Sequence, residues 1–337
     1  MKKSWYIAVF CLVFLCIAGP AFGAPRKITI KLASLVPEKT PWGAALNRMA
    51  AEWSKASNGE VELKIYHNGI MGSEEDVLRK LKTNSIQGAV LSTFGLNTIT
   101  PEIMTLSCPF LIRDNTELDL VMNDLKPELE RRINENGGFY TLAWSKVGWV
   151  RFFSKTPIFT PDDMRRQKLG TSETEPALMD AFKAMGYQMV PVSMTSILIN
   201  LTGGMIDAVY QSPVNVGAMQ IFGVAKNMAD INIAPFMGGI VLNQTSWRSI
   251  PDKYKPDLIR IAKRMETELD SSIRELEAGA IEIMGRHGLV TNQLSPAQKQ
   301  LWYDDMARIT PMLLGKTFKR EIYERIETII QAHRAGR

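Results

Sequence analysis

Cysteine is scarce in this 337-residue sequence. Two of the three cysteines, Cys11 and Cys16, lie in a leading segment that has the features of a removable signal, so Cys108 remains alone and no disulfide can form within the mature chain. Cys108 lies in the apolar stretch TLSCPFLI, which is typical of a small buried side chain. A catalytic thiol would need a histidine, and none of the segments around the three histidines indicates such a partner.

A large excess of charge is also missing. The formal net charge is +5, and the loss of Lys2 and Lys3 with the leading segment, which contains no acid, lowers it by two. The remaining excess is small and dispersed, which excludes a typical nucleic-acid-binding protein. With 45% hydrophobic and 22% charged residues, the composition is that of a folded globular protein long enough for two lobes.

The sequence has no apolar run long enough to span a bilayer. The apolar stretch at residues 6–18 follows a short basic start and is shorter than the roughly 20 residues that a membrane helix needs. A Gly19-Pro20 break and the small residues Ala21 and Gly23 then precede Ala24, which predicts a signal peptide over residues 1–23 that is cleaved after Gly23. Lipidation at Cys16 is disfavoured because the preceding residue, leucine, is not small. We therefore expect a periplasmic protein.

Recognised catalytic motifs are missing as well. The sequence contains no Gly-x-Ser-x-Gly elbow, His-Glu-x-x-His pair, phosphate-binding Gly-x-x-x-x-Gly-Lys-Ser/Thr loop or calcium loop. An exported enzyme would need an arrangement without a known signature, so we expect no enzymatic activity, no cofactor and no metal.

The first part of the sequence has a regular alternation of strand and helix patterns. Strands are predicted at residues 27–36, 60–69 and 85–95, and capped amphipathic helices at 40–59 and 73–83. This order predicts a mostly parallel sheet with helices on both faces. The loops at the carboxyl ends of the strands, residues 36–42, 68–73 and 92–97, are then candidate walls of a ligand site.

A second alternating series predicts a second lobe. Two aromatic-rich strand-like runs at residues 139–155 mark the first crossing between lobes, and a return strand is expected in INIAPFMGGIVLNQTSW. Helical periodicity over residues 256–286, with Leu258 through Ile283 on one face, predicts a helix of about 45 Å that braces both lobes. We expect lobe I at 24–148 plus about 233–270, lobe II at 149–232 plus about 271–320, and a C-terminal helical tail at 321–337.

Several segments, in this order, resemble the DctP-like substrate-binding proteins of tripartite ATP-independent periplasmic (TRAP) transporters. They are TPWGAALNRMAAEWSKASNGEVELKIYHNGIMGSEEDVLRKLKTNSIQGAV, CPFLIRD, FTPDDMRRQKLGTSET and GGMIDAVYQSP, and the similarity covers about residues 28–320. The resemblance implies an α/β, two-lobed periplasmic-binding-protein fold of type II, with mixed sheets and flanking helices. It also implies a receptor that closes over a small solute and delivers it to two integral membrane subunits.

The family usually carries an arginine in the second lobe that binds the solute carboxylate through a planar fork of donors. The corresponding stretch here is Lys168, Leu169, Gly170 and Thr171, so glycine replaces the arginine. Alternation along the strand predicts that Lys168, Gly170 and Ser172 face the cleft, while Leu169 and Thr171 face the core. Gly170 is therefore expected to open space in the site.

Other family positions suggest further contacts. Arg151 in GWVRFFSKTP matches a second family arginine, with a salt bridge as the alternative role. Tyr210 stands where the family often has an acidic residue, and Gln211, Ser212 and Asn215 either supply polar groups to the site or cap the following turn. Aromatic residues at predicted strand ends either line the cleft or belong to the core. The full set of expected solute-binding residues is Trp42, Phe94, Trp149, Arg151, Gly170, Glu173, Tyr210, Gln211, Asn215 and Phe236.

The replaced arginine bears on the ligand and the partners. It disfavours a simple dicarboxylate and favours a neutral, apolar or larger solute. The resemblance implies the small and large TRAP membrane subunits as partners, and some related systems that lack this arginine also use a tetratricopeptide-repeat protein. A receptor for a membrane sensor is the alternative function, and an exported enzyme is a less favoured one.

Overall fold

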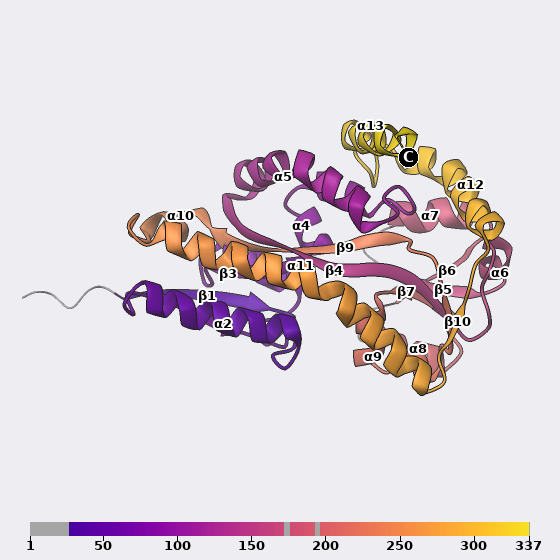
Figure 1. Ribbon diagram of the computed structural model, residues 1–337, viewed down its shortest axis with the longest axis horizontal. Coiled ribbons are helices and arrows are strands. Elements are labelled where there is room, and N and C mark those ends of the chain that lie inside the picture. The colour runs from indigo at the N-terminus through magenta and orange to yellow at the C-terminus, as the bar shows by residue number, and fades with distance from the viewer. Residues whose placement is uncertain (1–26, 172–175, 193–195, 337) are drawn as a thin grey trace, which may run out of the picture.

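The computed structural model describes residues 27–171, 176–192 and 196–336. It has two lobes connected by strands and helices that cross between them (Figure 1). The first lobe begins with β1 (Ile28–Ser34), α2 (Pro41–Ala56), β2 (Val61–Tyr66), α3 (Glu74–Lys82), β3 (Gly88–Ser92), α4 (Thr93–Asn97), η1 (Pro101–Ser107) and α5 (Asn115–Gly137). Within the described ranges, no helix is long and apolar enough to cross a membrane.

The chain then crosses to the second lobe through β4 (Phe139–Ser154) and returns through β9 (Ala234–Asn243). Between them lie α6 (Pro161–Arg165), β5 (Lys168–Thr171), α7 (Pro176–Ala184), β6 (Gln188–Pro191), α8 (Ile197–Thr202), β7 (Ala208–Gln211), α9 (Pro213–Ala218), η3 (Ile221–Gly223) and β8 (Asn227–Ala229). The chain ends with α10 (Gln244–Ser249), α11 (Lys255–Arg286), β10 (Val290–Asn292), α12 (Pro296–Leu313) and α13 (Arg320–Ala335).

Local sequence signals determine where several helices begin. Thr40 accepts a hydrogen bond from the Gly43 N–H at the start of α2, and proline follows it at the first helical position. Ser73 and Ser295 form capping boxes with Asp76 and Gln298 at the starts of α3 and α12. The predicted helices at these places are confirmed.

The strands run β2-β1-β3-β9-β4-β7-β5-β6, and β8 and β10 extend the sheet beside the second half of β4. The β1–β2 and β1–β3 pairs are parallel, as the alternating order of strand and helix predicts, whereas β9 is antiparallel to both of its neighbours. In the first lobe β4 is therefore an edge strand. In the second lobe it lies inside the sheet, between β8 and β7.

The predicted pair of strand-like runs at residues 139–155 is a single strand. β4 is continuous over 16 residues, and its ladder with β9 shifts register between Thr141 and Ala143 and again between Lys146 and Gly148. Gly148 has φ +115°, a conformation that a glycine adopts with little strain. The interruption that the sequence suggested is thus a bulge within one strand, located where the chain passes from one lobe to the other.

The sheet is covered on both faces in each lobe. In the first lobe, α2 and α11 pack on one face and α3, α5 and α13 on the other. In the second lobe, α8, α9 and the end of α11 cover one face, and α6, α7 and α12 the other. Helix α11, with 32 residues, extends along both lobes as predicted (Figure 1).

The buried face of α11 differs from the prediction near the C-terminal end of the helix. The helical period puts Ile283 on the apolar face, but Ile283 is 51% exposed, and Met284 is buried instead. About two turns before Met284, the acidic residue Glu277 is buried. The prediction failed here because helical spacing alone does not reveal that a carboxylate has a buried partner.

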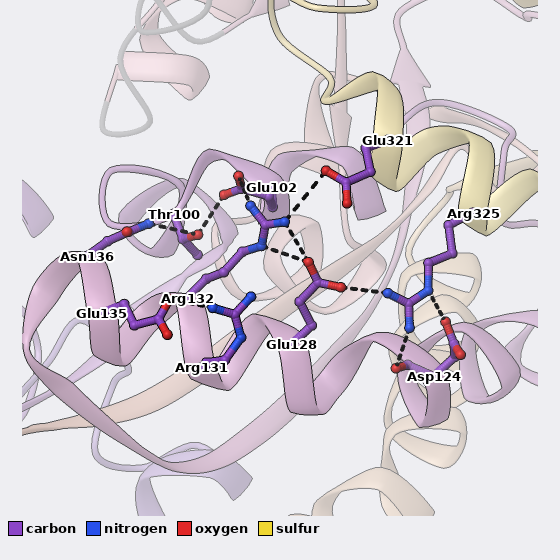
Figure 2. Close-up of polar contacts among 10 residues, drawn as sticks. All are labelled: Thr100, Glu102, Asp124, Glu128, Arg131, Arg132, Glu135, Asn136, Glu321 and Arg325. Atoms are coloured by element: carbon purple, nitrogen blue, oxygen red, sulfur yellow. Dashed lines mark hydrogen bonds and ion pairs between the residues drawn. The ribbon is translucent and has the colours of Figure 1, made fainter.

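The C-terminal helix α13 packs on the first lobe. Its Ile322, Ile326 and Ile330 belong to the same core cluster as α5. Polar contacts reinforce this packing (Figure 2): Arg325 donates to Asp124 and Glu128 of α5, each at 2.5 Å. Because α12 packs on the second lobe, the C-terminal pair of helices connects the two lobes, in addition to β4, β9 and α11.

Candidate functional site

A row of polar side chains crosses the second-lobe sheet on the face that α9 and α11 cover. Arg151 of β4 is paired in register with Gln211 of β7. On the other side of β4, Asp230 follows the end of β8, and its Oδ1 accepts a hydrogen bond from Arg151 Nη1 at 3.1 Å. Asp230, Arg151 and Gln211 therefore lie side by side at the place where the second-lobe strands meet the crossing.

Arg151 is held partly inside the protein. Its side chain is 17% exposed, and Nε has no hydrogen-bond partner among the described residues. Asp230 neutralises part of the arginine charge, and an acceptor placed at the free donors would complete its hydrogen bonding. The salt bridge that the sequence left open as an alternative is thus present, together with unused donor capacity.

The residues that follow Gln211 form a capped turn. Ser212 caps α9 by accepting from the Asn215 N–H, while Gln211 Oε1 accepts from the Ser212 N–H at 3.2 Å and from Asn215 Nδ2 at 3.4 Å. These contacts are the ones expected if Gln211, Ser212 and Asn215 cap the turn, which is one of the two roles that the sequence left open. Gln211 and Asn215 nevertheless remain partly exposed next to Arg151, so their contact with a solute stays a prediction.

Three aromatic residues of the expected set lie near the junction of the lobes. Phe94 of α4 and Phe236 of β9 have ring centroids 6.5 Å apart. Tyr210 is partly buried, and its hydroxyl lies 3.3 Å from Thr171 Oγ1. Phe94 and Tyr210 pack against the same core cluster, although they come from different lobes. Tyr210 precedes Gln211 in β7, so its ring lies on the face of the second-lobe sheet opposite to the polar row.

Two other aromatic residues of the expected set belong to the first-lobe core. Trp149 is 4% exposed, and its Nε1 donates to Asn115 Oδ1 at 3.1 Å. Trp42 packs against the cluster between α2 and the sheet. Trp149 therefore has the packing role that the sequence left open as an alternative, whereas Trp42 is only partly buried and its contact with a solute stays a prediction.

Gly170 does not open space at its position. It pairs with Val209, and a Cβ built on it would lie 2.8 Å from Ile206 Cδ1 and 3.1 Å from Val192 Cγ2. Leu169 is buried in the core as expected. The expectation of an open cleft at Gly170 is therefore wrong, because apolar side chains of the second-lobe core fill the volume beside it. Glu173 lies outside the described residues.

A carboxylate that the sequence did not single out lies at the carboxyl end of β3. Glu74 Oε1 accepts from the Ser92 N–H at 2.5 Å, and Oε2 accepts from the Ser92 hydroxyl at 2.7 Å. Ser92 in turn caps α4 by accepting from the Phe94 and Gly95 N–H groups. The donors of Ser92, in one of the predicted ligand-wall loops, are thus already satisfied by the protein.

A second unexpected carboxylate, Glu277 of α11, lies behind Arg151. It is 8% exposed, and its Oε1 accepts from the Trp149 N–H at 2.6 Å. Burial raises its pKa, while the hydrogen bond from Trp149 and the charge of Arg151 oppose that shift. The sequence signal for Glu277 is its place on the otherwise apolar face of a long helix.

Other titratable groups have structural roles. Cys108 is buried, and burial raises the pKa of its thiol to about 12, so the thiol is protonated at neutral pH. His67 Nε2 lies 2.9 Å from Asn47 Oδ1. Over the part of the chain that the structure describes, no group of three or more His, Cys, Asp or Glu residues is arranged to hold a metal ion.

Comparison with known proteins decides the family. Residues 32–316 match the family model described as "Bacterial extracellular solute-binding protein, family 7". The chain belongs to this family. The resemblance to DctP-like binding proteins of TRAP transporters is thereby confirmed, and with it the function of a solute-binding receptor.

Curated relatives of this family 7 receptor share about a fifth of its residues. The C4-dicarboxylate-binding protein DctB of Bacillus subtilis is 21% identical over 90% of this chain and 87% of its own. The C4-dicarboxylate-binding periplasmic protein DctP of Rhodobacter capsulatus is 22% identical over 87% of this chain and 90% of its own.

Solved structures confirm the two-lobed fold. A TRAP periplasmic solute-binding protein from Sulfurospirillum deleyianum, with bound succinate, superposes with a TM-score of 0.78 at 22% identity and covers 90% of this chain and 99% of its own. One from Pseudomonas putida F1, with bound D-glucuronate, has a TM-score of 0.79 at 21% identity and covers 89% and 97%. The expected α/β binding-protein fold is confirmed.

Proposed function

We propose that this family 7 receptor captures a small, largely apolar solute that carries at most one carboxylate. The solute lies between the lobes, with its carboxylate on Arg151. The observation that carries the proposal is the Arg151–Asp230 pair, which leaves one partly neutralised cation whose Nε has no hydrogen-bond partner among the described residues.

The hydrogen-bond donors available around Arg151 favour a solute with one carboxylate over a solute with two. A buried carboxylate needs a cation or several donors to replace its hydration. Gly170 supplies no side-chain donor, and the donors of Ser92 are taken by Glu74. Arg151 keeps donor capacity for a single anionic group.

Similarity to known proteins supports the acid group in this proposal. The two named relatives are C4-dicarboxylate-binding proteins, and the solved structures contain succinate and D-glucuronate. A C4 dicarboxylate, as those relatives bind, is therefore the second candidate for the solute. It differs from the first in needing two sets of charged contacts.

The proposed partners are those that the family implies. We infer that the receptor is exported with cleavage after Gly23 and delivers its solute to the small and large TRAP membrane subunits, without chemical change to the solute. A tetratricopeptide-repeat partner, and a membrane sensor in place of the transporter, stay predictions. Intact mass spectrometry of the exported protein tests the cleavage site.

Native mass spectrometry of the purified receptor, followed by thermal-shift screening, tests the solute class. The panel contains apolar monocarboxylates of about six to ten carbons, hydrophobic neutral compounds and lipids, and the C4 acids succinate and malate. We expect stabilisation by apolar monocarboxylates and little effect of C4 acids, since binding raises the melting temperature by mass action. Strong stabilisation by succinate or malate would overturn the proposal in favour of the second candidate.

A further inference from the structure

Helix α11 covers the open edge of β4 with acidic side chains. In the first lobe, one edge of β4 pairs with β9, and no described strand pairs with the other edge. Three carboxylates of α11 accept backbone N–H groups of β4 instead: Glu266 from Trp144 at 3.1 Å, Asp270 from Lys146 at 3.4 Å and Glu277 from Trp149 at 2.6 Å. The helix thus replaces a missing neighbour strand.

Glu277 differs from the other two carboxylates in forming no salt bridge, although the charge of Arg151 acts on it from a distance. Glu266 is 2.5 Å from Lys126 Nζ, and Asp270 is 3.1 Å from Lys146 Nζ. Among the described residues, no lysine, arginine or histidine forms a salt bridge with Glu277. The Trp149 N–H is its hydrogen-bond partner, at the shortest distance of the three contacts.

The backbone beside Glu277 is built around its carboxylate. Gly148 has φ +115°, and a Cβ on this residue would lie 2.3 Å from Glu277 Oε1. Any larger residue at this position would displace the carboxylate, and the positive φ also favours glycine. The contact therefore involves both a turn of β4 that requires glycine and the side chain that fills the space next to it.

The contact lies where β4 passes between the lobes. The register of β4 with β9 shifts between Lys146 and Gly148, and two residues after Trp149 comes Arg151 in the polar row. β4 and α11 both extend through the two lobes, so a bond between them at this point restricts how one lobe rotates against the other. A bend of β4 at Gly148 requires the Trp149 N–H to move relative to α11.

We propose that Glu277 is a positioning residue of the hinge, which fixes the relative orientation of the lobes by holding the Trp149 N–H, and so places Arg151 for solute capture. The inference rests on the proposed capture of solute between the lobes, but its test needs no solute. Glu266 offers a matched control, because it makes the same kind of bond to β4 from the same helix but within the first lobe.

Double electron–electron resonance tests this role in the solute-free receptor. Nitroxide labels are attached at Lys39→Cys in the first lobe and Ala218→Cys in the second, both exposed positions, while the native Cys108 is buried. We expect Glu277→Ala to widen the inter-label distance distribution by at least about twofold. Glu277→Gln keeps an acceptor oxygen and is expected to retain most of the narrow distribution, as are Glu266→Ala and Glu266→Gln.

The comparison separates a hinge role from a general structural one. If Glu277→Ala and Glu266→Ala lower the melting temperature alike but leave the distance distribution unchanged, the proposal is overturned. If Glu277→Ala does not fold, Glu277→Asp replaces it, since the shortened side chain keeps the charge but cannot reach the Trp149 N–H, and an unchanged distribution in that variant overturns the proposal equally. Failure of the solute screen would leave these outcomes unaffected.

Discussion

Arg151 Nη1 lies 3.1 Å from Asp230 Oδ1, and the two side chains are 17% and 33% exposed. The two residues come from neighbouring positions across the second-lobe sheet, although they are 79 residues apart in the sequence. A partly buried ion pair with spare donors can exchange part of its internal bonding for a bond to a ligand. This relationship determines the charge that a solute meets and underlies the first two predictions.

Arg151→Met is expected to weaken binding of an apolar monocarboxylate by about 10- to 100-fold, since a hydrogen bond to a charged group contributes roughly 1.5–3 kcal/mol. Calorimetric titration measures the change. Arg286→Met is the control, because Arg286 is exposed and pairs with Glu282 on the surface of α11. Equal affinity of the Arg151 variant and the parent would exclude Arg151 from the site.

Asp230→Asn is expected to increase affinity for the carboxylate severalfold and to make binding more dependent on salt. The substitution keeps the shape of the side chain but removes the negative charge that competes for Arg151. Titrations at low and high ionic strength measure both effects, and Asp257→Asn, an exposed acid on α11, is the control. A loss of affinity would show that Asp230 positions Arg151 more than it competes for it.

Gly170→Arg is expected to lower the free energy of unfolding by about 1–3 kcal/mol and to confer no carboxylate binding. The new side chain would overlap Ile206 and Val192, and overpacked cores lose stability in this range. The double variant Gly170→Arg/Ile206→Ala should recover part of the loss, as urea unfolding can measure. A stable single variant that binds succinate would show that the volume beside Gly170 adapts to a ligand.

The pH dependence of stability should differ in sign between Glu277 and Glu266. Burial raises the pKa of Glu277, so its folded form binds protons more tightly than its unfolded form. The parent should therefore gain stability relative to Glu277→Gln as the pH falls through the raised folded pKa toward the ordinary glutamate value. Burial also acts to raise the pKa of Glu266, but the hydrogen bond and charge of Lys126 outweigh it and lower that pKa. The parent should therefore lose stability relative to Glu266→Gln as the pH falls below the ordinary glutamate pKa of about 4.3 toward the lowered folded value.

Urea unfolding of the parent and both glutamine variants at a series of pH values checks these signs. The charge of Arg151 acts on Glu277, and Asp230 is the partner of Arg151, so the variants of these two residues serve to separate indirect effects. A stability difference for Glu277→Gln that does not change with pH would show that the carboxylate keeps its ordinary pKa in the fold.

The more deeply buried ion pair of the C-terminal helix α13 should contribute more to stability than the more exposed one. Arg334 donates to both oxygens of Glu117, at 2.7 and 2.9 Å, and the Glu117 side chain is 3% exposed. Arg325 also makes two ionic bonds to α5, but the side chains involved are more exposed (Figure 2). Arg325 is 40% exposed, Asp124 41% and Glu128 18%. We expect Arg334→Met to cost about 2–4 kcal/mol and Arg325→Met no more than about 1 kcal/mol. Equal losses in thermal or urea unfolding would contradict this ranking.

The sequence predicts the elements of this fold where local signals determine them. The β-α-β-α-β order, the caps at Thr40 and Ser73 and the length of α11 all follow from patterns within a few turns of the chain. The continuity of β4 does not, because it depends on pairing with β9, which is more than 80 residues away in sequence.

The residues of the candidate site are also hard to predict from the sequence, because several of their contacts are with residues distant in sequence. Arg151 and Tyr210 are found from the sequence because a family pattern points to them. Asp230, Glu277 and Glu74 are not, since each acquires its role from a partner distant in sequence: Arg151, the Trp149 N–H and Ser92, respectively. Gly170 was misjudged because strand alternation gives the face of a residue but not what already fills that face.

Competition between solute classes tests the central claim most directly. The receptor is incubated with an equimolar mixture of apolar monocarboxylates and C4 dicarboxylates, and the bound species is identified by native mass spectrometry, in the parent and in Arg151→Met. We predict a monocarboxylate adduct that is strongly reduced in the variant. A dicarboxylate adduct in the parent, or a monocarboxylate adduct that persists in Arg151→Met, would contradict the account.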